Sequence, residues 1–377
     1  MTMIIFLIIS WIIWLGWLSF SFFVIVGFIG FLLYRIHEED YPVQDLELVI
    51  VSVASKSVKP SLLECVSHHR STFFDYPLNV VIDQGAQLEK ELKKVNYIKL
   101  TIVPKSFRPE LVGKGRAMQY FIQNHNTPTW FAFLDDDNLI LDDSFLYEIP
   151  YYEKHGYSVA NPTLTPREGK SKITYTMDFI RLFDDKTIFR FFTGLLKRPL
   201  LGLHGELLIA QGTTLNSAGT YSKRSVTEDY LFSTKINKLK LKSWQSKTRV
   251  SIKSPNSIRD LMKQRKRWFT GLSSDLNQGS KLQKYLTLYR IVLWKTGILY
   301  CPFVMLFFIA FNIVPSVWLL ALLMISGLYY YVVYLVGTMK ARSVFSFFAI
   351  PFYGIIEALS VMRAKGNADA FEVINKE

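Results

Sequence analysis

The apolar run Trp130-Phe131-Ala132-Phe133-Leu134 leads directly into the acidic triplet Asp135-Asp136-Asp137. Such a run, followed at once by polar residues, predicts a buried strand whose carboxyl end carries the acids. Side chains alternate along a strand, so Asp135 and Asp137 point the same way while Asp136 points elsewhere. In open α/β sheets, ligands bind beyond the carboxyl ends of the strands. The stretch therefore predicts an α/β fold with a binding site at its acidic end.

Similar apolar runs upstream predict the neighbouring strands Leu46–Val53, Leu78–Ile82 and Ile98–Val103. A helix is expected at Ser61–His69, after the first of them. Strands that alternate with helices are typical of a largely parallel sheet. Asp83 follows the second strand, so we expect it at the same edge of the sheet as Asp135. We assign this α/β domain to residues 35–284.

Asp135 and Asp137 together suit a divalent cation. A hard cation such as Mg²⁺ takes oxygen ligands, usually one or two carboxylates together with the phosphates of a substrate. The alternative is a surface loop or a helix cap, because acidic triplets are common there. The preceding apolar strand favours the metal site, since it fixes where the two carboxylates point.

A second acidic motif, Thr227-Glu228-Asp229, offers a general base. When a hydroxyl attacks the anomeric carbon of a sugar opposite a departing diphosphate, a carboxylate must take the hydroxyl proton, as in inverting hydrolases that activate water. Asp229 is the candidate for this role. The alternative is a capping residue for a helix over Tyr230–Ile236.

A basic motif follows at Gln264-Arg265-Lys266-Arg267-Trp268. On a helix, Gln264, Arg267 and Trp268 lie on one face. The planar, permanently charged guanidinium group suits diphosphate oxygens, so Arg267, and with it Arg265, is a candidate to stabilise a leaving diphosphate. Trp268 offers an apolar plate for an acceptor sugar. The alternative is a basic helix near a membrane, with its tryptophan at the level of the headgroups.

The composition indicates a membrane protein with a large polar domain. With 50% hydrophobic and 20% charged residues, the 377-residue chain is too apolar for a typical soluble enzyme and too charged for a pure membrane bundle. Met3 to Tyr34 carries no charge, and this run exceeds the roughly 20 residues that a spanning helix needs. No basic stretch precedes the run and no small-residue cleavage site follows it, so a transmembrane anchor at residues 1–34 is favoured over a signal peptide.

A second apolar block extends from about Ile291 to Thr338 and is interrupted at Asn312-Ile313-Val314-Pro315. Each half is long enough to cross a membrane once, so the block predicts two transmembrane helices. Cations flank the block on both sides, which places both ends in the cytoplasm. These cations are Lys281, Lys284, Arg290, Lys295, Lys340 and Arg342.

A third apolar run, Ser343 to Met362, contains Pro351 and Glu357. A carboxylate inside the hydrocarbon is costly, so an interfacial or re-entrant helix is favoured over a third crossing. We therefore place the C-terminal membrane region at residues 285–363 and a cytosolic tail at residues 364–377.

The formal net charge of +13 raises the question of nucleic acid. The basic residues are scattered between apolar segments and concentrate near the predicted membrane face, so membrane lipids and a diphosphate are better partners than nucleic acid. Basic and aromatic residues between Lys186 and Arg198 predict an amphipathic helix on the membrane surface, with a core helix as the alternative. Cys65 and Cys301 form no disulfide framework, which fits a reduced cytosolic domain.

Taken together, these motifs resemble the membrane-integrated family 2 glycosyltransferases, the superfamily of cellulose, chitin and hyaluronan synthases. The resemblance extends from Leu46 to Gly271, with membrane segments in the expected flanks. It implies a GT-A (Rossmann-like) catalytic domain on the cytosolic face of an integral membrane protein. It also implies a nucleoside-diphosphate sugar as donor and Mg²⁺ or Mn²⁺ as cofactor.

The resemblance also implies roles for individual residues. Asp83 would recognise the nucleobase, and Lys114, within Gly113–Ala117, would contact the donor. The D-x-D motif, which holds the donor and the metal, is matched by Asp135 and Asp137. The T-E-D base is matched by Asp229. The Q-x-x-R-W motif, which binds the donor and the acceptor, is matched by Gln264, Arg265, Arg267 and Trp268.

Three stretches look most like the egghead-type β-1,4-mannosyltransferases, which extend a lipid-linked glucose using GDP-mannose: Gly202–Glu206, Ser225–Asp229 and Gln264–Gly271. His204 and Glu206 would then lie near the acceptor, with a satisfied core histidine as the alternative for His204. We expect an inverting glycosyltransferase that moves a sugar to a hydroxyl of a lipid-linked saccharide. GDP-mannose is the favoured donor, and a UDP-sugar stays open.

Two other functions stay open. A processive β-polysaccharide synthase using a UDP-sugar needs several helices for its channel, and this chain offers only about three clear spans. The tail Phe371–Lys376 resembles the gating loop of cellulose synthases, with Ile374 in place of its threonine; a solvated tail is the alternative. A catalytically silent membrane scaffold is the second function. The oligomeric state is not indicated by the sequence.

Overall fold

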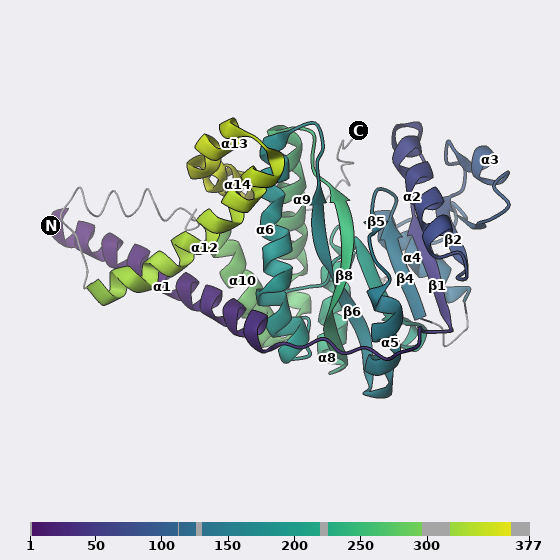
Figure 1. The fold of residues 1–377 in the computed structure, drawn as a ribbon, viewed down its shortest axis with the longest axis horizontal. Coiled ribbons are helices and arrows are strands. Elements are labelled where there is room, and N and C mark those ends of the chain that lie inside the picture. The colour runs from purple at the N-terminus through teal and green to yellow at the C-terminus, as the bar shows by residue number, and fades with distance from the viewer. Residues whose placement is uncertain (1, 112, 126–129, 219–224, 296–316, 363–377) are drawn as a thin grey trace.

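The computed structural model describes residues 2–111, 113–125, 130–218, 225–295 and 317–362. Within these residues, eight strands form one sheet (Figure 1). The strands are β1 (Leu46–Val51), β2 (Leu78–Asp83), β3 (Lys99–Val103), β4 (Trp130–Asp135), β5 (Leu139–Ile140), β6 (Tyr157–Arg167), β7 (Leu207–Gln211) and β8 (Lys242–Lys253). Their order across the sheet is β3-β2-β1-β4-β7-β6-β8-β5.

The half of the sheet that the sequence predicts is present. Strands β1 to β4 pair in parallel in the order β3-β2-β1-β4, as strands alternating with helices should. The other half is mixed: β7 is antiparallel to both β4 and β6, β8 is parallel to β6, and β5 is antiparallel to β8. The expectation of a largely parallel sheet was wrong for this half, because an apolar run such as Leu207–Gln211 is buried equally well in either direction.

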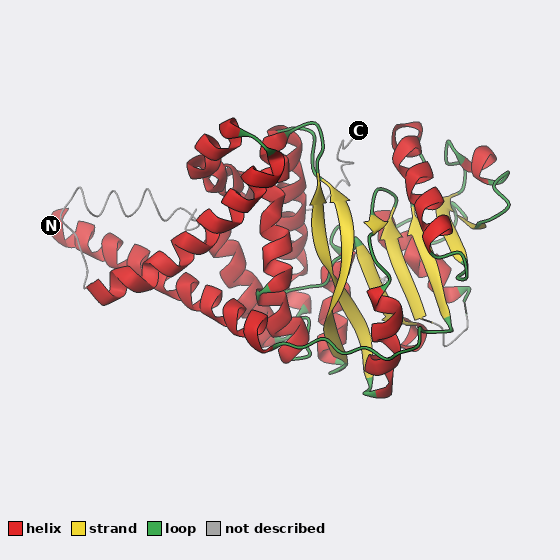
Figure 2. Ribbon diagram, viewed as in Figure 1, coloured by secondary structure: helices red, strands yellow, loops and turns green. Residues whose placement is uncertain are grey.

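Helices cover both faces of the sheet (Figure 2). Further helices form a helical part beside the sheet, called here the helical end (Figure 2). The helices of these two groups include α2 (Lys59–Thr72), α3 (Glu89–Leu92), α4 (Gly113–Gln123), α5 (Ser144–Lys154), α6 (Lys172–Lys186), α7 (Gly212–Ala218), α8 (Glu228–Lys238), α9 (Ile258–Asp275) and α10 (Lys281–Lys295), with the short 3₁₀ turns η1 (Lys56–Val58) and η3 (Leu276–Gln278).

Strand β1 explains the layering, because it is buried on both faces. Leu48 and Ile50 pack with α2 and α5. Val49 and Val51 point the other way and pack with α4, α7 and α8. A strand between two helical layers reads as an unbroken apolar run, which is how the sequence signals it. With both faces covered, the strand ends are where polar side chains can gather.

The helical end is built around two long helices, α1 (Thr2–Leu33) and α12 (Val317–Ala341). They contact each other and extend away from the sheet (Figure 1). A separate hydrophobic cluster joins them to α6, α9 and α10. The uncharged run at the N-terminus is thus one helix of 32 residues. Its crossing of a membrane stays a prediction.

The third apolar run forms a broken helix. Among the described residues, Val344–Met362 is the helical stretch that is long and apolar enough to cross a membrane, judged by length and composition alone. It is divided at Pro351 into α13 (Val344–Ala349), the 3₁₀ turn η4 (Ile350–Phe352) and α14 (Tyr353–Met362). Glu357 is buried against the protein, whereas Phe345 and Phe348 are exposed. The interfacial or re-entrant placement of this helix stays a prediction.

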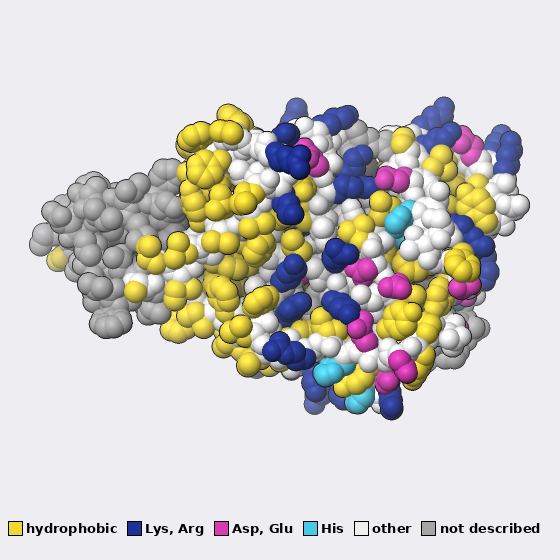
Figure 3. Space-filling view, in the orientation of Figure 1, with side chains coloured by type: hydrophobic (Ala, Val, Ile, Leu, Met, Phe, Trp, Pro, Cys, Tyr) yellow, Lys and Arg dark blue, Asp and Glu magenta, His cyan; other side chains and the backbone are white. Residues whose placement is uncertain are grey.

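Hydrophobic side chains gather on the surface of the helical end, over α13 and the neighbouring helices (Figure 3). A band of Lys and Arg side chains lies between this area and the sheet (Figure 3). The predicted break at Asn312–Pro315, Cys301 and the tail at residues 364–377 lie outside the described residues.

The segment from Lys186 to Arg198, predicted to lie on a membrane surface, packs against the protein. It contains a π-helical turn, η2 (Arg190–Leu195), which contacts α1 and β8. Phe189 and Phe192 are buried. Because its apolar side chains meet protein, the structure favours the core alternative for this segment.

The packing of α1 can be tested at Gly30, because α1 closely approaches the backbone of residues 187–191 there. A Cβ atom on Gly30 would lie 2.5 Å from the Phe191 nitrogen and the Thr187 oxygen. Helix propensity alone would make Gly30→Ala stabilising by about 1 kcal/mol. We expect the reverse, a loss of about 1–3 kcal/mol from overpacking. The measurement is the thermal midpoint of unfolding in detergent.

The matched control is Leu33→Ala, at an exposed position of the same helix. It should leave the thermal midpoint nearly unchanged. A Gly30→Ala protein that is more stable than the parent would contradict this packing of α1.

Candidate active site

A cleft of about 810 Å³ opens where the strand ends meet the helical end. Its walls come from the ends of β1, β2 and β4 and from α4, α6, α8, α9 and α10. All the site residues predicted from the sequence line it except Gln264. They are Asp83, Lys114, Asp135, Asp137, His204, Glu206, Asp229, Arg265, Arg267 and Trp268.

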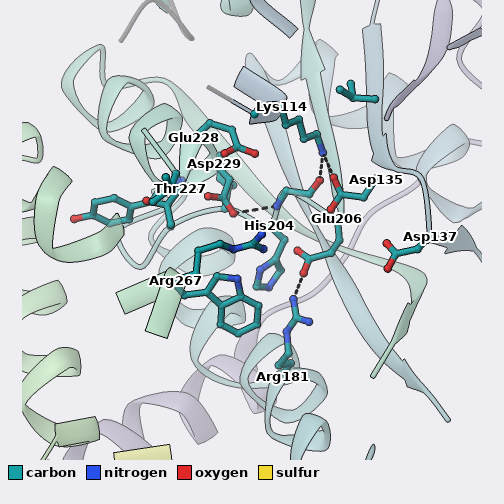
Figure 4. A pocket seen from close by; sticks show the side chains of 18 of the residues that line it. Lys114, Asp135, Asp137, Arg181, His204, Glu206, Thr227, Glu228, Asp229 and Arg267 are labelled. Carbon is teal, nitrogen blue, oxygen red and sulfur yellow. Dashed lines mark hydrogen bonds and ion pairs between the residues drawn. The ribbon is translucent and has the colours of Figure 1, made fainter. Parts of the chain in front are cut away.

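Strand pairing brings Asp135 and Glu206 to the same edge. Asp135, the last residue of β4, pairs with Val51 of the parallel strand β1. Strand β7 runs the other way, and its first residue, Leu207, pairs with Leu134. The amino end of β7 therefore meets the carboxyl end of β4, so Glu206 enters the cleft beside Asp135 (Figure 4).

Lys114 on α4 connects these two strand ends. Its Nζ donates to Asp135 Oδ1 at 2.8 Å and to the Gly205 carbonyl at 2.5 Å. Burial disfavours the charged amine, but Asp135 and Glu228 outweigh that effect and raise the pKa of Lys114. A cation is thus held between the predicted donor carboxylate and the loop that precedes β7.

All three acids of the triplet line the cleft. Asp136 Oδ2 also accepts from Ser52 Oγ at 2.5 Å, and a separate direction for Asp135 and Asp137 stays a prediction. No group of three or more His, Cys, Asp or Glu side chains within the described residues is arranged to hold an ion alone. Mg²⁺ is typically bound by one or two carboxylates, with substrate phosphates as its remaining ligands. The residues present therefore fit a cation that binds together with its substrate.

Asp83 lies at the end of β2, where the sequence placed it. Its Oδ1 accepts from Arg116 Nη1 at 2.5 Å, and half of its side chain is exposed. The carboxylate is therefore held in one direction but still accessible from the cleft. Its contact with a nucleobase stays a prediction.

Asp229 lies in the first turn of α8, close to several polar groups. Its Oδ1 accepts from the Tyr230 amide at 2.7 Å and its Oδ2 from the Gly205 amide at 3.2 Å. Burial and the nearby Glu206 raise the pKa of Asp229 to about 6. Burial and Asp229 likewise raise the pKa of Glu228. A carboxylate with a raised pKa binds a proton more readily, as a general base should.

Trp268 lies between charged groups. Arg181 on α6 forms an ion pair with Glu206, and its guanidinium carbon is 4.8 Å from the centre of the Trp268 ring. The guanidinium carbon of Arg265 is 4.5 Å from the same centre. The ring is thus held by two cation–π contacts. Its packing against an acceptor sugar stays a prediction.

His204 is anchored from both its ring and its backbone. Its Nε2 lies 2.6 Å from Oδ1 of the buried Asp185, and its amide donates to Asn161 Oδ1 at 2.8 Å. These contacts fit the alternative of a satisfied histidine, although the ring lines the cleft. Glu206 is likewise engaged by Arg181.

The three polar site residues of the basic motif, Gln264, Arg265 and Arg267, do not share one role. Arg267 reaches toward the centre of the cleft, beneath Asp229 (Figure 4). Arg265 is 2% exposed and contacts the buried carboxylates of Asp178 and Glu357. Gln264 is also buried and accepts from Arg265 Nη1 at 2.8 Å. This geometry favours Arg267 over Arg265 and Gln264 as the ligand of a diphosphate.

Sequence reasoning missed Arg181, Asp184 and Arg290, which also line the cleft. Burial raises the pKa of Asp184 to about 7, against the opposing charge of Arg290, whose Nη2 lies 3.7 Å from Asp184 Oδ2. The acidic pair Asp184-Asp185, near the end of α6, was the available signal. Arg290 appeared in the sequence only as a cation flanking the second apolar block.

Comparison with known proteins agrees with the motifs. A sequence model of the family described as "Glycosyl transferase family group 2" matches residues 130–335, more than half of the chain. Beta-1,4-mannosyltransferase bre-3 of Caenorhabditis briggsae is 24% identical over 366 residues, which cover 87% of this chain and 78% of the relative. Beta-1,4-mannosyltransferase egh of Drosophila melanogaster is 24% identical over 240 residues, covering 59% of this chain and 52% of the relative.

A solved structure shares the fold. The mannosyltransferase PcManGT from Pyrobaculum calidifontis, solved in complex with GDP-Man and Mn²⁺, superposes with a TM-score of 0.52 at 13% identity. The match covers 92% of this chain and 99% of that protein. The chain thus has the mixed α/β, GT-A-like fold that the sequence predicts.

Gly271 on α9 generates a test of how the two motifs pack. A Cβ atom there would lie 2.5 Å from the Oγ1 and Cγ2 atoms of Thr227, the residue that precedes α8. We expect Gly271→Ala to lower stability by about 1–3 kcal/mol, because Thr227 is short and buried and cannot swing away. Thermal unfolding in detergent measures this loss.

Gly205→Ala is the matched control, since its Cβ atom would meet Asp229 Oδ2 only at an ordinary contact distance of 3.5 Å. Equal thermal midpoints for the two glycine variants would show that α9 does not press on Thr227.

Proposed function

The chain belongs to glycosyl transferase family group 2, and on this basis we propose that it moves a sugar from a nucleoside diphosphate to a hydroxyl of a lipid-linked saccharide. The new bond is a β-glycosidic bond formed with inversion. One observation carries the proposal: Lys114, Asp229 and Arg267 line one cleft with the two carboxylates of the D-x-D motif. A cation for the donor, a base for the acceptor and a cation for the leaving group are therefore within reach of one substrate pair.

Asp229 is the proposed general base. Its two oxygens are oriented by the amides of Tyr230 and Gly205, so the carboxylate keeps one direction in the absence of substrate. The acceptor hydroxyl would give its proton to this carboxylate as it attacks the anomeric carbon. Burial supports the step, because it raises the pKa of Asp229 and so strengthens the base.

Arg267 and Lys114 are proposed to stabilise the diphosphate. As the bond to the sugar breaks, negative charge grows on the leaving phosphate oxygens, and fixed cations lower the barrier most when they are already in place. Lys114 is held by Asp135 and by the Gly205 carbonyl. Arg267 approaches the same cleft from α9. The two cations would thus meet the donor from opposite walls.

Asp135 and Asp137 are proposed to hold a divalent cation, Mg²⁺ or Mn²⁺, with the donor phosphates as its remaining ligands. When bound, such a cation would neutralise phosphate charge and orient the diphosphate. Asp135 would then serve both the cation and Lys114, because Lys114 Nζ is already 2.8 Å from Asp135 Oδ1.

The favoured donor is GDP-mannose. Support comes from the names of two relatives, which are beta-1,4-mannosyltransferases, and from the GDP-Man and Mn²⁺ complex of a protein with the same fold. Asp83 would accept a hydrogen bond from the nucleobase. A carboxylate accepts equally from guanine N1–H and uracil N3–H, so Asp83 alone does not select GDP over UDP.

The acceptor is proposed to be carried by a membrane lipid. The cleft is lined by α9 and α10 of the helical end, where hydrophobic side chains gather on the surface beside a band of cations (Figure 3). We propose that this end is integral to the membrane, that α1 and α12 cross it, and that the catalytic domain faces the cytosol. A lipid-linked sugar would then enter from the side where Trp268 lies.

The donor and the base are tested together by nucleotide release. Purified protein in detergent is given GDP- and UDP-sugars, candidate glycolipids, and Mn²⁺, Mg²⁺ or EDTA. We expect GDP release from GDP-mannose that requires both the metal and a glycolipid. Asp229→Asn should lower turnover at least about a thousandfold while nucleotide binding is retained, because it removes the base and keeps the shape.

Asp75→Asn, at an exposed position outside the cleft, is the control. Release from UDP-sugars alone would remove GDP-mannose as the donor. If neither the wild type nor Asp229→Asn consumes any of the sugar nucleotides, the protein is the catalytically silent scaffold.

The raised pKa of Asp229 predicts a pH dependence. The base is competent when deprotonated, above about pH 6, and is lost as the pH falls through this value. We expect kcat/KM to fall about tenfold per pH unit well below that point. Thermal unfolding at each pH separates this effect from denaturation. A profile that is flat from about pH 5 to pH 8 would contradict Asp229 as a base with a raised pKa.

A further inference from the structure

A buried ion cluster joins the basic motif to the C-terminal helix α14. Arg265 is at its centre. Its Nη2 donates to Asp178 Oδ1 on α6 at 2.8 Å, and its Nε lies 3.2 Å and 3.3 Å from the two carboxylate oxygens of Glu357 on α14. Glu357 is 92 residues from Arg265 in the sequence. The cluster therefore connects three helices that are distant in the chain.

A fourth helix joins through Glu357. The indole Nε1 of Trp294 on α10 donates to Glu357 Oε2 at 3.1 Å. Glu357 and Asp178 are buried almost completely, and so is Arg265. A charge in such a place is strongly destabilising unless it is paired. Arg265 therefore depends on its two carboxylates to stay where it is.

The position of Arg265 sets the position of Trp268. The Arg265 guanidinium carbon lies 4.5 Å from the centre of the Trp268 ring, and Arg181 contacts the same ring at 4.8 Å. The ring, Arg181 and Arg265 all line the cleft. A displacement of Arg265 would therefore be transmitted to Trp268 at the cleft wall.

We propose that Glu357 is a positioning residue for the acceptor subsite: it holds Arg265, and Arg265 holds the Trp268 ring in the orientation that an acceptor sugar meets. The donor end of the cleft is held by other contacts, from Lys114 Nζ to Asp135 Oδ1 and to the Gly205 carbonyl. This inference rests on the proposed sugar transfer, which is the reaction that Glu357 would serve. The contacts of Glu357 do not depend on that proposal.

The test is Glu357→Gln, which keeps the shape and removes the charge. Its control is Glu148→Gln. Glu148 is also fully buried and also accepts from a tryptophan indole, Trp244 Nε1 at 2.9 Å. Unlike the Glu357 partners Arg265 and Trp294, its partners Trp244 and Lys247 do not line the cleft. The two variants thus make the same chemical change at two buried carboxylates that bind an indole, of which Glu357 also pairs with an arginine.

Three quantities are measured with GDP-mannose and a glycolipid: the acceptor kcat/KM, the donor KM, and the ratio of sugar transferred to sugar lost by hydrolysis. Glu357→Gln should lower the acceptor kcat/KM about ten- to hundredfold and lower the transfer ratio, because a small misplacement of the acceptor slows transfer strongly. The donor KM should change less than about twofold. Glu148→Gln should leave all three unchanged.

Hydrogen–deuterium exchange supplies a readout that needs no activity. Exchange in the peptide that covers α9 should rise in Glu357→Gln and stay at the parent level in Glu148→Gln. Unchanged exchange in both variants, or equal losses of donor and acceptor parameters in Glu357→Gln, would overturn the proposal. A parent protein that transfers no sugar would instead overturn the proposed function, and the exchange experiment would still decide the role of Glu357.

Discussion

The cleft depends on one antiparallel strand pairing. Strands β1, β2 and β4 deliver Ser52, Asp83 and Asp135 to one edge of the sheet, as any parallel sheet would. Only the reversed direction of β7 brings the loop before it to that same edge. This loop then contacts both the cation Lys114 and the carboxylate of Asp229. The Gly205 carbonyl accepts from Lys114 at 2.5 Å, and the Gly205 amide donates to Asp229 at 3.2 Å. If β7 were parallel to β4, its first residues would lie at the opposite edge of the sheet.

The charges of the cleft are arranged as alternating pairs. Lys114 faces Asp135, and Arg181 faces Glu206. This balance lets these four charges lie close together at small cost, since each of them is paired before a substrate arrives. A diphosphate brings negative charge and a divalent cation brings positive charge, so the two together change the net charge of the cleft little. Asp229 differs from these acids, because its oxygens accept from backbone amides and burial raises its pKa.

The sequence was most informative where one short segment carries both structure and chemistry. The apolar strand before Asp135 predicted its own burial, its direction and the place of the acids at its carboxyl end. It could not predict the direction of β7, because burial is the same in both directions, nor the ion pair of Arg181, because its partner is distant in the chain. Helical spacing placed Gln264 with Arg267 and Trp268, but Gln264 instead accepts from Arg265. Helix α9 packs against α6, α8, α10 and α14, so it has more than one contact face, and spacing alone does not reveal which face meets the substrate.

One motif on helix α9 therefore contains residues with two roles: lining the cleft and packing the helical end. Arg267 and Trp268 line the cleft, while Arg265, which reaches the cleft wall beside Trp268, binds carboxylates from α6 and α14. Two arginines separated by one residue point to different sides of a helix, so one can meet a substrate while the next is part of the core. Lysine would serve poorly at position 265, because a single ammonium cannot meet two carboxylates and lie flat on an indole ring at once. The arginine at this position thus couples the packing of the helical end to the wall of the cleft.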